Sequence, residues 1–259
     1  MGKLKQFEIY KYILLLVFLC KGFAVLAQPK EVLKQHLIWF NYNNNIQLFP
    51  HWFWITEVFE RRFIDEFKHH HLLLRGHIHY KFNHGFDVGG GFTYSLQSAQ
   101  TVESKSTLAV PELRPHLEIN HKYHGHKINL TNRIKIEDRF FRNTLNEELV
   151  NGYQSNFRFR YFILVDVELV KFKNEQVLKF KLSDEIHVDA GNQIKFGTFD
   201  QNRIYAGISV DVHPKLAIEL GYLNWYQKRS SGYQYYNRNI LKLSINHKIN
   251  LIPKNKPPN

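Results

Sequence analysis

The feature that most constrains the fold of this chain is a strict alternation of apolar and polar side chains, repeated in segments of about ten residues. In the segment 72–83, one face carries leucine, isoleucine and aromatic side chains, and the other includes Arg75, His77, His79 and Lys81. A period of two residues is that of a β-strand, and a tilted strand needs about ten residues to cross a bilayer. We therefore predict an all-β chain.

The alternation returns along the whole chain. Ten segments of this kind follow Trp52, and residues 37–48 form one more, which meets Trp52 across Pro50 and His51. Bacterial outer-membrane barrels have even strand numbers, so either residues 37–48 fall short of a full strand or a partner strand is hidden in the sequence. The prediction is an antiparallel barrel of about ten to twelve strands. After Gln28, no stretch is long and apolar enough for a transmembrane helix.

The character of the two faces separates a membrane barrel from a soluble sheet protein, which would alternate as well. The polar faces are dense in long charged side chains, such as Arg133, Lys135 and Glu137, and they oppose long apolar faces. A small soluble barrel fills its interior with apolar side chains, and so many charges in an apolar core would carry large desolvation costs. The pattern favours an outer-membrane-type barrel with a polar, charged lumen.

Aromatic residues and loop lengths agree with this interpretation, because membrane barrels carry interfacial aromatic girdles, short periplasmic turns and longer outer loops. The aromatic residues near expected strand ends are Trp52, Trp54, Tyr80, Phe82, Tyr94, Tyr123, Tyr222, Trp225 and Tyr226. The short connections are expected near 50–51, 83–86, 124–126, 173–175 and 213–214. The longer connections are expected near 63–70, 98–111, 140–154, 188–200 and 228–236.

The N-terminal residues are typical of a cleavable secretory signal. A basic stretch, 1–12, precedes the apolar run 13–20, and small residues at −3 and −1 mark a cleavage site after Ala27. The apolar run is too short to span a bilayer, which takes about 20 residues. We expect residues 1–27 to be removed and residues 28–259 to form a single barrel domain in the bacterial outer membrane. The one cysteine, Cys20, falls in the removed part, which excludes disulfides and thiol-ligated metals from the mature protein.

The chain is strongly basic. Its formal net charge is +12, of which the expected signal, with four lysines against Glu8, accounts for +3 and the mature part for +9. A basic balance points to anionic partners, but export makes nucleic acid unsuitable. The expected partners are outer-membrane lipid around the barrel and anionic small solutes inside it.

Charged residues on the polar faces are candidates for ion pairs that line the lumen. They are Glu57, Arg61, Arg75, Arg114, Glu118, Arg133, Lys135, Glu137, Arg139, Arg158, Arg160, Glu185 and Arg203. Arginine suits such a set because its planar guanidinium binds carboxylates through two parallel hydrogen bonds. Two roles remain open: a structural ladder that fills a narrow barrel, and a porin-like channel whose excess of Arg and Lys passes small anions.

A third interpretation is an outer-membrane hydrolase, lipase- or protease-like, with a His-based site. Its candidates are His77 and His79 with Ser95, or His187 with Asp184. A chain with 15 histidines offers such pairs by chance, and no lipase-like or protease-like motif marks a strand end. We assign no catalytic residue, cofactor or metal site. The histidines of 69–71 and 124–126 are interpreted as loop residues, because structural zinc requires four ligands in fixed geometry.

Several short motifs, in a fixed order, are similar to those of a known family. The first are Trp39, Trp52-x-Trp54-x-x-Glu57-x-x-x-Arg61-Arg62 and Leu74-Arg75-x-x-x-x-Tyr80. Later ones are Glu112-Leu113-Arg114-Pro115-His116, Arg133-x-Lys135-Ile136-Glu137-x-Arg139-Phe140, Phe157-Arg158-Phe159-Arg160-Tyr161 and Gln201-Asn202-Arg203-x-x-x-Gly207. Together they resemble the DUF2490 family, uncharacterised proteins, many from Bacteroidetes-type bacteria, that are treated as outer-membrane β-barrels. The resemblance implies a fold and a location, and it brings no activity and no catalytic residues.

Overall fold

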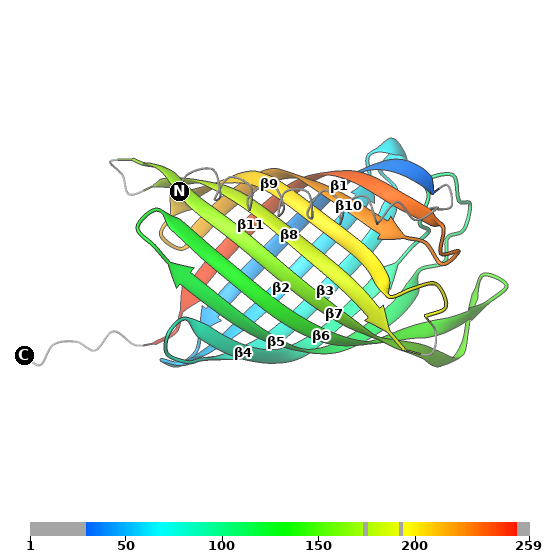
Figure 1. Ribbon diagram of the computed structural model, residues 1–259, viewed down its shortest axis with the longest axis horizontal. Helices are drawn as coiled ribbons and strands as arrows, with labels where there is room; N and C mark the ends of the chain where they lie inside the picture. The colour runs from blue at the N-terminus through cyan, green and yellow to red at the C-terminus, as the bar shows by residue number, and fades with distance from the viewer. Residues whose placement is uncertain (1–29, 173–175, 192–193, 253–259) are drawn as a thin grey trace, which may run out of the picture. The chain divides into compact units, whose positions relative to one another are not determined.

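The alternating segments form strands that close into one barrel (Figure 1). The computed structural model describes residues 30–172, 176–191 and 194–252. The expected signal peptide, residues 1–27, lies outside them. No helix within the described ranges is long and apolar enough to cross a membrane.

Eleven strands make up the barrel within these ranges, so an all-β, antiparallel barrel of ten to twelve strands is confirmed. A short 3-10 turn, η1 (Asp65–Phe67), separates β2 from β3. The strands are β1 (Glu31–Gln47), β2 (Trp52–Phe63), β3 (His69–Lys81), β4 (Phe86–Gln97), β5 (Val110–His124), β6 (Ile128–Leu145), β7 (Glu148–Lys171), β8 (Val177–Ala190), β9 (Phe199–His213), β10 (Leu216–Lys228) and β11 (Gln234–Asn250).

The barrel closes through a parallel contact between β1 and β11. Gln35 pairs with Arg238 at 2.7 Å, Asn43 with Asn246 at 2.8 Å, and the Leu251 N–H donates to the Gln47 carbonyl at 3.0 Å. The partners are separated by 203, 203 and 204 residues, and a constant difference in number is the mark of parallel strands. The expectation of an even strand number is therefore wrong. When consecutive strands alternate in direction and their number is odd, the first and last strands run the same way. The barrel can then close only through a parallel contact.

An odd strand count also places the two ends of the barrel sequence at opposite rims. We call the rim with the connections 64–68, 98–109, 146–147, 191–198 and 229–233 the long-loop end. The other rim, the short-turn end, has the connections 48–51, 82–85, 125–127, 172–176 and 214–215. Strand β1 begins at the long-loop end, and β11 finishes at the short-turn end.

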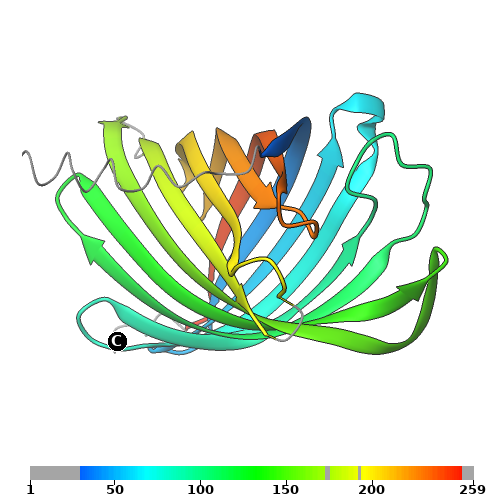
Figure 2. The ribbon, with the colours of Figure 1, turned by 45° about the vertical axis from the view of Figure 1, so that its right-hand side comes forward.

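One expected long loop, 140–154, is instead a hairpin. Strands β6 and β7 continue past the rim to a two-residue turn at Asn146 and Glu147, whose φ angles are 49° and 63°. Positive φ at both central residues is the type I′ geometry that matches the twist of a hairpin, and here it occurs without the glycine that normally marks it. The hairpin extends beyond its neighbours at the long-loop end (Figures 1 and 2).

The two faces of the sheet are reversed relative to a soluble protein. Outward-facing Leu117, Ile134 and Phe92 are 68%, 53% and 47% exposed, whereas inward-facing Lys135 and Glu137 are fully buried. Water-soluble proteins bury apolar side chains and almost never bury Lys or Glu without a partner. The interior is therefore mostly polar, apart from an apolar cluster that includes Trp39 and Trp225, and the exterior carries a broad apolar band.

Exposed aromatic side chains form a girdle at the short-turn end: Phe49, Trp52, Phe82, Phe86, Tyr123 and Phe172. Trp225, which the sequence placed among the outward-facing aromatics, is instead buried and points into the lumen. It packs edge-on against Trp39, with ring centroids 5.6 Å apart. The reason is its position on β10, where it lies two residues from inward-facing Leu223.

The parallel closure predicts which cysteine pairs cross-link. In a chain with Cys20→Ser, Asn43→Cys with Asn246→Cys should form a disulfide, because the native side chains are hydrogen-bonded across the closing strands. Gln35→Cys with Asn246→Cys should not, because the parallel register places Gln35 beside Arg238. Electrophoresis without reductant measures both. Cross-linking of the second pair in place of the first would contradict the parallel closure.

Candidate functional site

The lumen holds all thirteen charged residues singled out in the sequence. Most are buried, and Glu57, Arg133 and Arg203 are half-buried. Cross-strand register explains their pairing, because Glu57 lies opposite Arg75, and Glu118 lies opposite Lys135. The Arg75–Glu57 ion pair measures 2.7 Å, and the Lys135–Glu118 pair measures 2.5 Å.

Two glutamates each bind several cations. Glu185 accepts hydrogen bonds from Arg133 at 2.8 Å and Arg160 at 2.6 Å, and Arg203 lies 3.7 Å from it. Glu112 accepts from Arg114 at 2.6 Å and Arg139 at 2.5 Å. Glu185 thus joins the four strands β6–β9, and Glu112 joins β5 to β6, so loss of either would leave several buried guanidinium groups without a counter-charge.

Two buried arginines have no carboxylate partner among the described residues. The Arg61 guanidinium stacks on Trp39 at 4.0 Å and contacts His71 Nδ1 at 3.1 Å. Arg238 is fully buried and donates to three glutamine oxygens, those of Gln35, Gln100 and Gln227. Its guanidinium carbon also lies 4.3 Å from the Trp225 ring centroid. Neutral amides and aromatic faces stabilise these cations without cancelling their charge.

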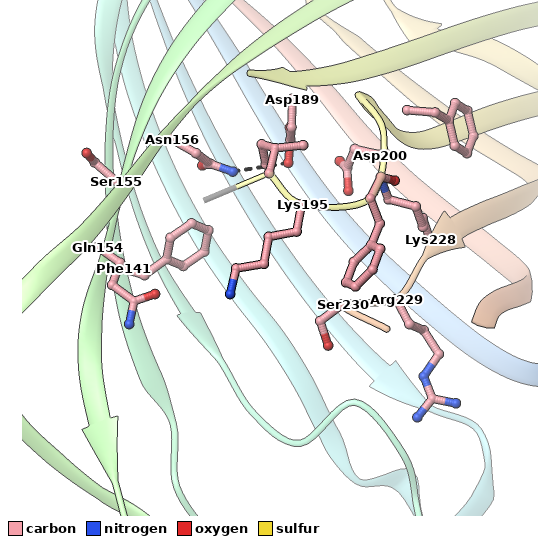
Figure 3. Close-up of a pocket in the computed structure, with 13 residues that line it drawn as sticks. Phe141, Gln154, Ser155, Asn156, Asp189, Lys195, Asp200, Lys228, Arg229 and Ser230 are labelled. Carbon is pink, nitrogen blue, oxygen red and sulfur yellow. Dashed lines mark hydrogen bonds between the residues drawn. The ribbon is translucent and has the colours of Figure 1, made fainter. Parts of the chain in front are cut away.

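Three spaces follow one another along the barrel. The vestibule, of about 410 Å³, lies at the long-loop end and is lined by residues of β6–β9, by residues 194–196 and 229–230 of two connections, and by Lys228. In Figure 3, Asn156 and Asp189 are joined by a hydrogen bond at its wall, with Lys195, Lys228 and Arg229 around it. The inner cavity, of about 240 Å³, lies toward the short-turn end and includes Asn43, Glu219 and Lys242 in its lining.

Between them lies a gap of about 40 Å³, which we call the arginine gap. It is lined by Arg61, Arg75, Arg114, Arg139, Arg158, Arg160 and Arg203, together with His70, His71, His187, Gln97, Gln100, Gln201, Gln227, Leu73 and Trp225. Not one of these lining residues is a carboxylate. The carboxylates that pair with its arginines lie behind them, so the gap presents guanidinium groups and amides to whatever enters.

The arginine gap is closed on both sides by side chains. Arg61, Arg75, Arg160 and Arg203 line both the gap and the inner cavity, so they stand between the two. On the vestibule side, Arg158 pairs with Asp189 at 2.8 Å and Asp200 at 2.7 Å. The volume suits a few waters or one small ion, since a water needs about 10–15 Å³ of such space.

Four residues that complete this network were not among the ion-pair candidates taken from the sequence: Glu112, Asp189, Asp200 and Arg238. Glu112 was on the polar side of an alternating segment and could have been included on that signal, whereas Asp189 fell in the connection expected at 188–200, which the structure gives partly to β8. Arg238 and Asp200 lie at strand starts, where alternation has barely begun.

The His-based catalytic candidates are not assembled. Ser95 Oγ donates to Glu112 at 3.3 Å and accepts from Arg114, rather than from a histidine. Asp184 is exposed on the outer face and pairs with Asn202, whereas His187 is buried in the lumen. His77 and His79 do lie together, 2.8 Å apart between ring nitrogens.

The histidines of 69–71, expected in a loop, instead begin strand β3, and they do not converge on one point. His69 contacts Ser98, His70 contacts Gln100, and His71 contacts Arg61. Within the described residues, the side chains that gather as a group of three or more candidate ligands are instead His77, His79 and Glu118.

Comparison with known proteins identifies the family. No curated protein matches the chain. The family model described as "Protein of unknown function (DUF2490)" matches residues 37–237, from β1 into β11. This match covers well over half of the 259 residues, and it includes every lumen-lining residue of the arginine gap. The chain belongs to the DUF2490 family.

Proposed function

We propose that this protein is an outer-membrane β-barrel, exported with a cleavable signal peptide, that binds small inorganic anions and passes them through the arginine gap. The membrane part of the proposal rests on the apolar band and the aromatic girdle. An apolar band this broad would make the protein associate with other molecules in water, whereas lipid chains can cover it.

The anion part rests on a single observation: seven arginines and no carboxylate line the gap. Arginine stays charged in protein interiors, and Arg61 has no carboxylate within ion-pair reach in the described structure. A dehydrated anion at this point would receive several N–H donors and would offset the cost of burying unpaired cations. Rings of basic side chains favour anions over cations in the same way in known pores.

The size of the gap restricts the solute. A volume of about 40 Å³ admits a monatomic or small inorganic anion and excludes sugars, nucleotides and peptides. The vestibule and the inner cavity are larger, so the arginine gap sets the selectivity. Passage requires side chains such as Arg61 and Arg203 to change rotamer, because they separate the gap from the inner cavity.

Planar-bilayer recording tests the anion pathway. Purified protein should give conductance steps with a reversal potential, under a KCl gradient, that indicates preference for chloride. Arg61→Gln and Arg203→Gln should each move the reversal potential toward zero, because each removes a cation from the narrowest point.

The matched control is Arg62→Gln. Arg62 is the next residue along β2 and is partly exposed, where it pairs with Glu60 at 2.8 Å. This variant should keep the selectivity of the unmodified protein. The absence of conductance, or selectivity that Arg61→Gln and Arg203→Gln leave unchanged, would instead assign the ion pairs the purely structural role of closing the lumen.

Substitutions on the outer face test the membrane location. Leu117→Arg, near the middle of β5, should lower the free energy of unfolding from lipid vesicles by about 2–4 kcal/mol, the cost of arginine at the bilayer midplane. Tyr123→Arg, at the girdle, should cost only about 0–1 kcal/mol. If both changes stayed within about 0.5 kcal/mol, the outer face would behave as a water-exposed surface.

A further inference from the structure

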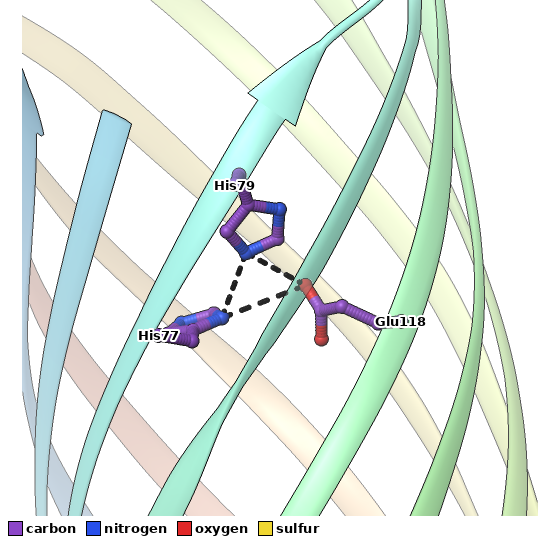
Figure 4. Close-up of side chains that lie close together, drawn as sticks. All are labelled: His77, His79 and Glu118. Atoms are coloured by element: carbon purple, nitrogen blue, oxygen red, sulfur yellow. Dashed lines mark hydrogen bonds and ion pairs between the residues drawn. The ribbon is translucent and has the colours of Figure 1, made fainter. Parts of the chain in front are cut away.

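A cluster of buried side chains on the wall formed by β3, β4 and β5 is not used by the proposed anion pathway. His77 and His79 of β3 point toward Glu118 of β5 (Figure 4). His77, His79 and Glu118 are 3%, 1% and 4% exposed. His79 and Glu118 lie on strands that are not adjacent, because β4 runs between them.

Glycines of β4 make this approach possible. The register places Gly89 opposite both His79 and Glu118, and Gly91 opposite His77. A Cβ atom at Gly89 would overlap the His79 ring, and one at Gly91 would overlap His77. The missing side chains leave the space in which the imidazoles lie across β4 and reach the next strand.

The three facing atoms have the spacing of metal ligands. His77 Nδ1 and His79 Nε2 are 2.8 Å apart, His79 Nε2 is 3.4 Å from Glu118 Oε1, and His77 Nδ1 is 3.7 Å from the same oxygen. Ligands of a tetrahedral Zn²⁺ stand about 3.3 Å from one another, given bond lengths of about 2.0–2.1 Å. The observed distances bracket that value.

The outer nitrogens of both histidines face carboxylates. His79 Nδ1 lies 2.8 Å from Asp87 Oδ1, and His77 Nε2 lies 3.5 Å from Glu57 Oε2. Asp87 holds the proton of His79 on Nδ1, which leaves a lone pair on Nε2, and the longer 3.5 Å contact with Glu57 favours the same arrangement in His77 more weakly. Two nitrogen lone pairs and a carboxylate oxygen then converge, an arrangement that a cation between them would stabilise. Carboxylate–histidine pairs of this kind are the usual outer contacts of bound zinc.

From this geometry we propose that His77, His79 and Glu118 bind a divalent transition-metal ion, Zn²⁺, in the barrel wall. Two imidazole nitrogens favour zinc over calcium or magnesium, which prefer oxygen ligands. His116 lies beside the cluster, its ring 5.4 Å from that of His77, and neither of its ring nitrogens has a hydrogen-bond partner in the described structure. It is the side chain available to supply a fourth ligand.

The nearby cations limit the affinity of this site and provide a test. Lys135 Nζ binds Glu118 Oε2 at 2.5 Å, so Oε1, which accepts a 3.2 Å hydrogen bond from Asn120, is the oxygen that faces the histidines; the Lys135 charge repels a metal ion. Lys135→Met should therefore bind metal at least about tenfold more tightly than the unmodified protein. The ion reaches the cluster from the inner cavity, because Glu57, which contacts His77, lines that cavity. The proposal does not depend on the anion pathway.

The experiment is a titration of untagged, detergent-solubilised protein with Co²⁺ and Zn²⁺. Co²⁺ should bind at one ion per chain with the visible absorption of a four-coordinate site, and Zn²⁺ should displace it. His79→Gln and Glu118→Gln should abolish this spectrum, whereas His121→Gln should keep it. His121 is on β5 as well, but it lies on the outer face of that strand, where its ring contacts that of Phe86 with centroids 4.4 Å apart.

A variant that keeps all three ligands guards against loss by misfolding. Asp87→Asn should weaken Co²⁺ binding by about 10–100-fold without abolishing the spectrum, as expected for an outer carboxylate. The proposal is overturned if the unmodified protein gives no four-coordinate Co²⁺ spectrum. It is also overturned if folded His79→Gln keeps that spectrum, or if Lys135→Met and Asp87→Asn leave the affinity unchanged.

Discussion

Mutual neutralisation of buried charges is the interaction on which this barrel depends. Its interior holds arginine, lysine, glutamate and aspartate side chains from nearly every strand, beside one apolar cluster that includes Trp39 and Trp225. Buried charges are tolerated when geometry and counter-charges compensate their desolvation, and here shared carboxylates such as Glu185 and Glu112 do so across several strands. Backbone hydrogen bonds between strands hold the wall together. Inside it, the properties of the lumen differ between places where buried charges are fully paired and places where they are not.

Compensation is uneven around the wall. On the side of β3–β5, carboxylates and histidines gather around His77, His79 and Glu118, an arrangement suited to a cation. On β2 and β11, Arg61 and Arg238 rest on tryptophan rings and amides, beside a gap without carboxylates. One narrow lumen thus contains a site suited to a cation and a site suited to an anion. The first brings together two histidines and a carboxylate, and the second has arginines without facing carboxylates.

The sequence predicted those features that depend on neighbouring residues in the chain. Alternation of side chains assigns each strand residue to a face, so the inward position of residues such as Arg133, Lys135 and Glu137 could be predicted without knowing the fold. Strand partners are not local. The parallel contact of β1 and β11 joins residues 203 positions apart, the turn at Asn146 lacks a glycine signal, and the inward turn of Trp225 follows from its register on β10. The histidine cluster was equally hidden, because it needs His79, Gly89 and Glu118 to align across three strands.

The parallel closure sets the order in which this barrel is completed. Each neighbouring pair from β1 to β11 is connected by a short stretch of chain and forms by local folding, but the last contact must wait until both ends of the sheet exist. Contacts between residues so distant in sequence form slowly, because the chain must lose the entropy of closing a long loop before the contact can stabilise it. Until then both edge strands expose unpaired backbone, so the β1–β11 seam is the place where an assembly machine, a misfolded partner or a second copy would insert.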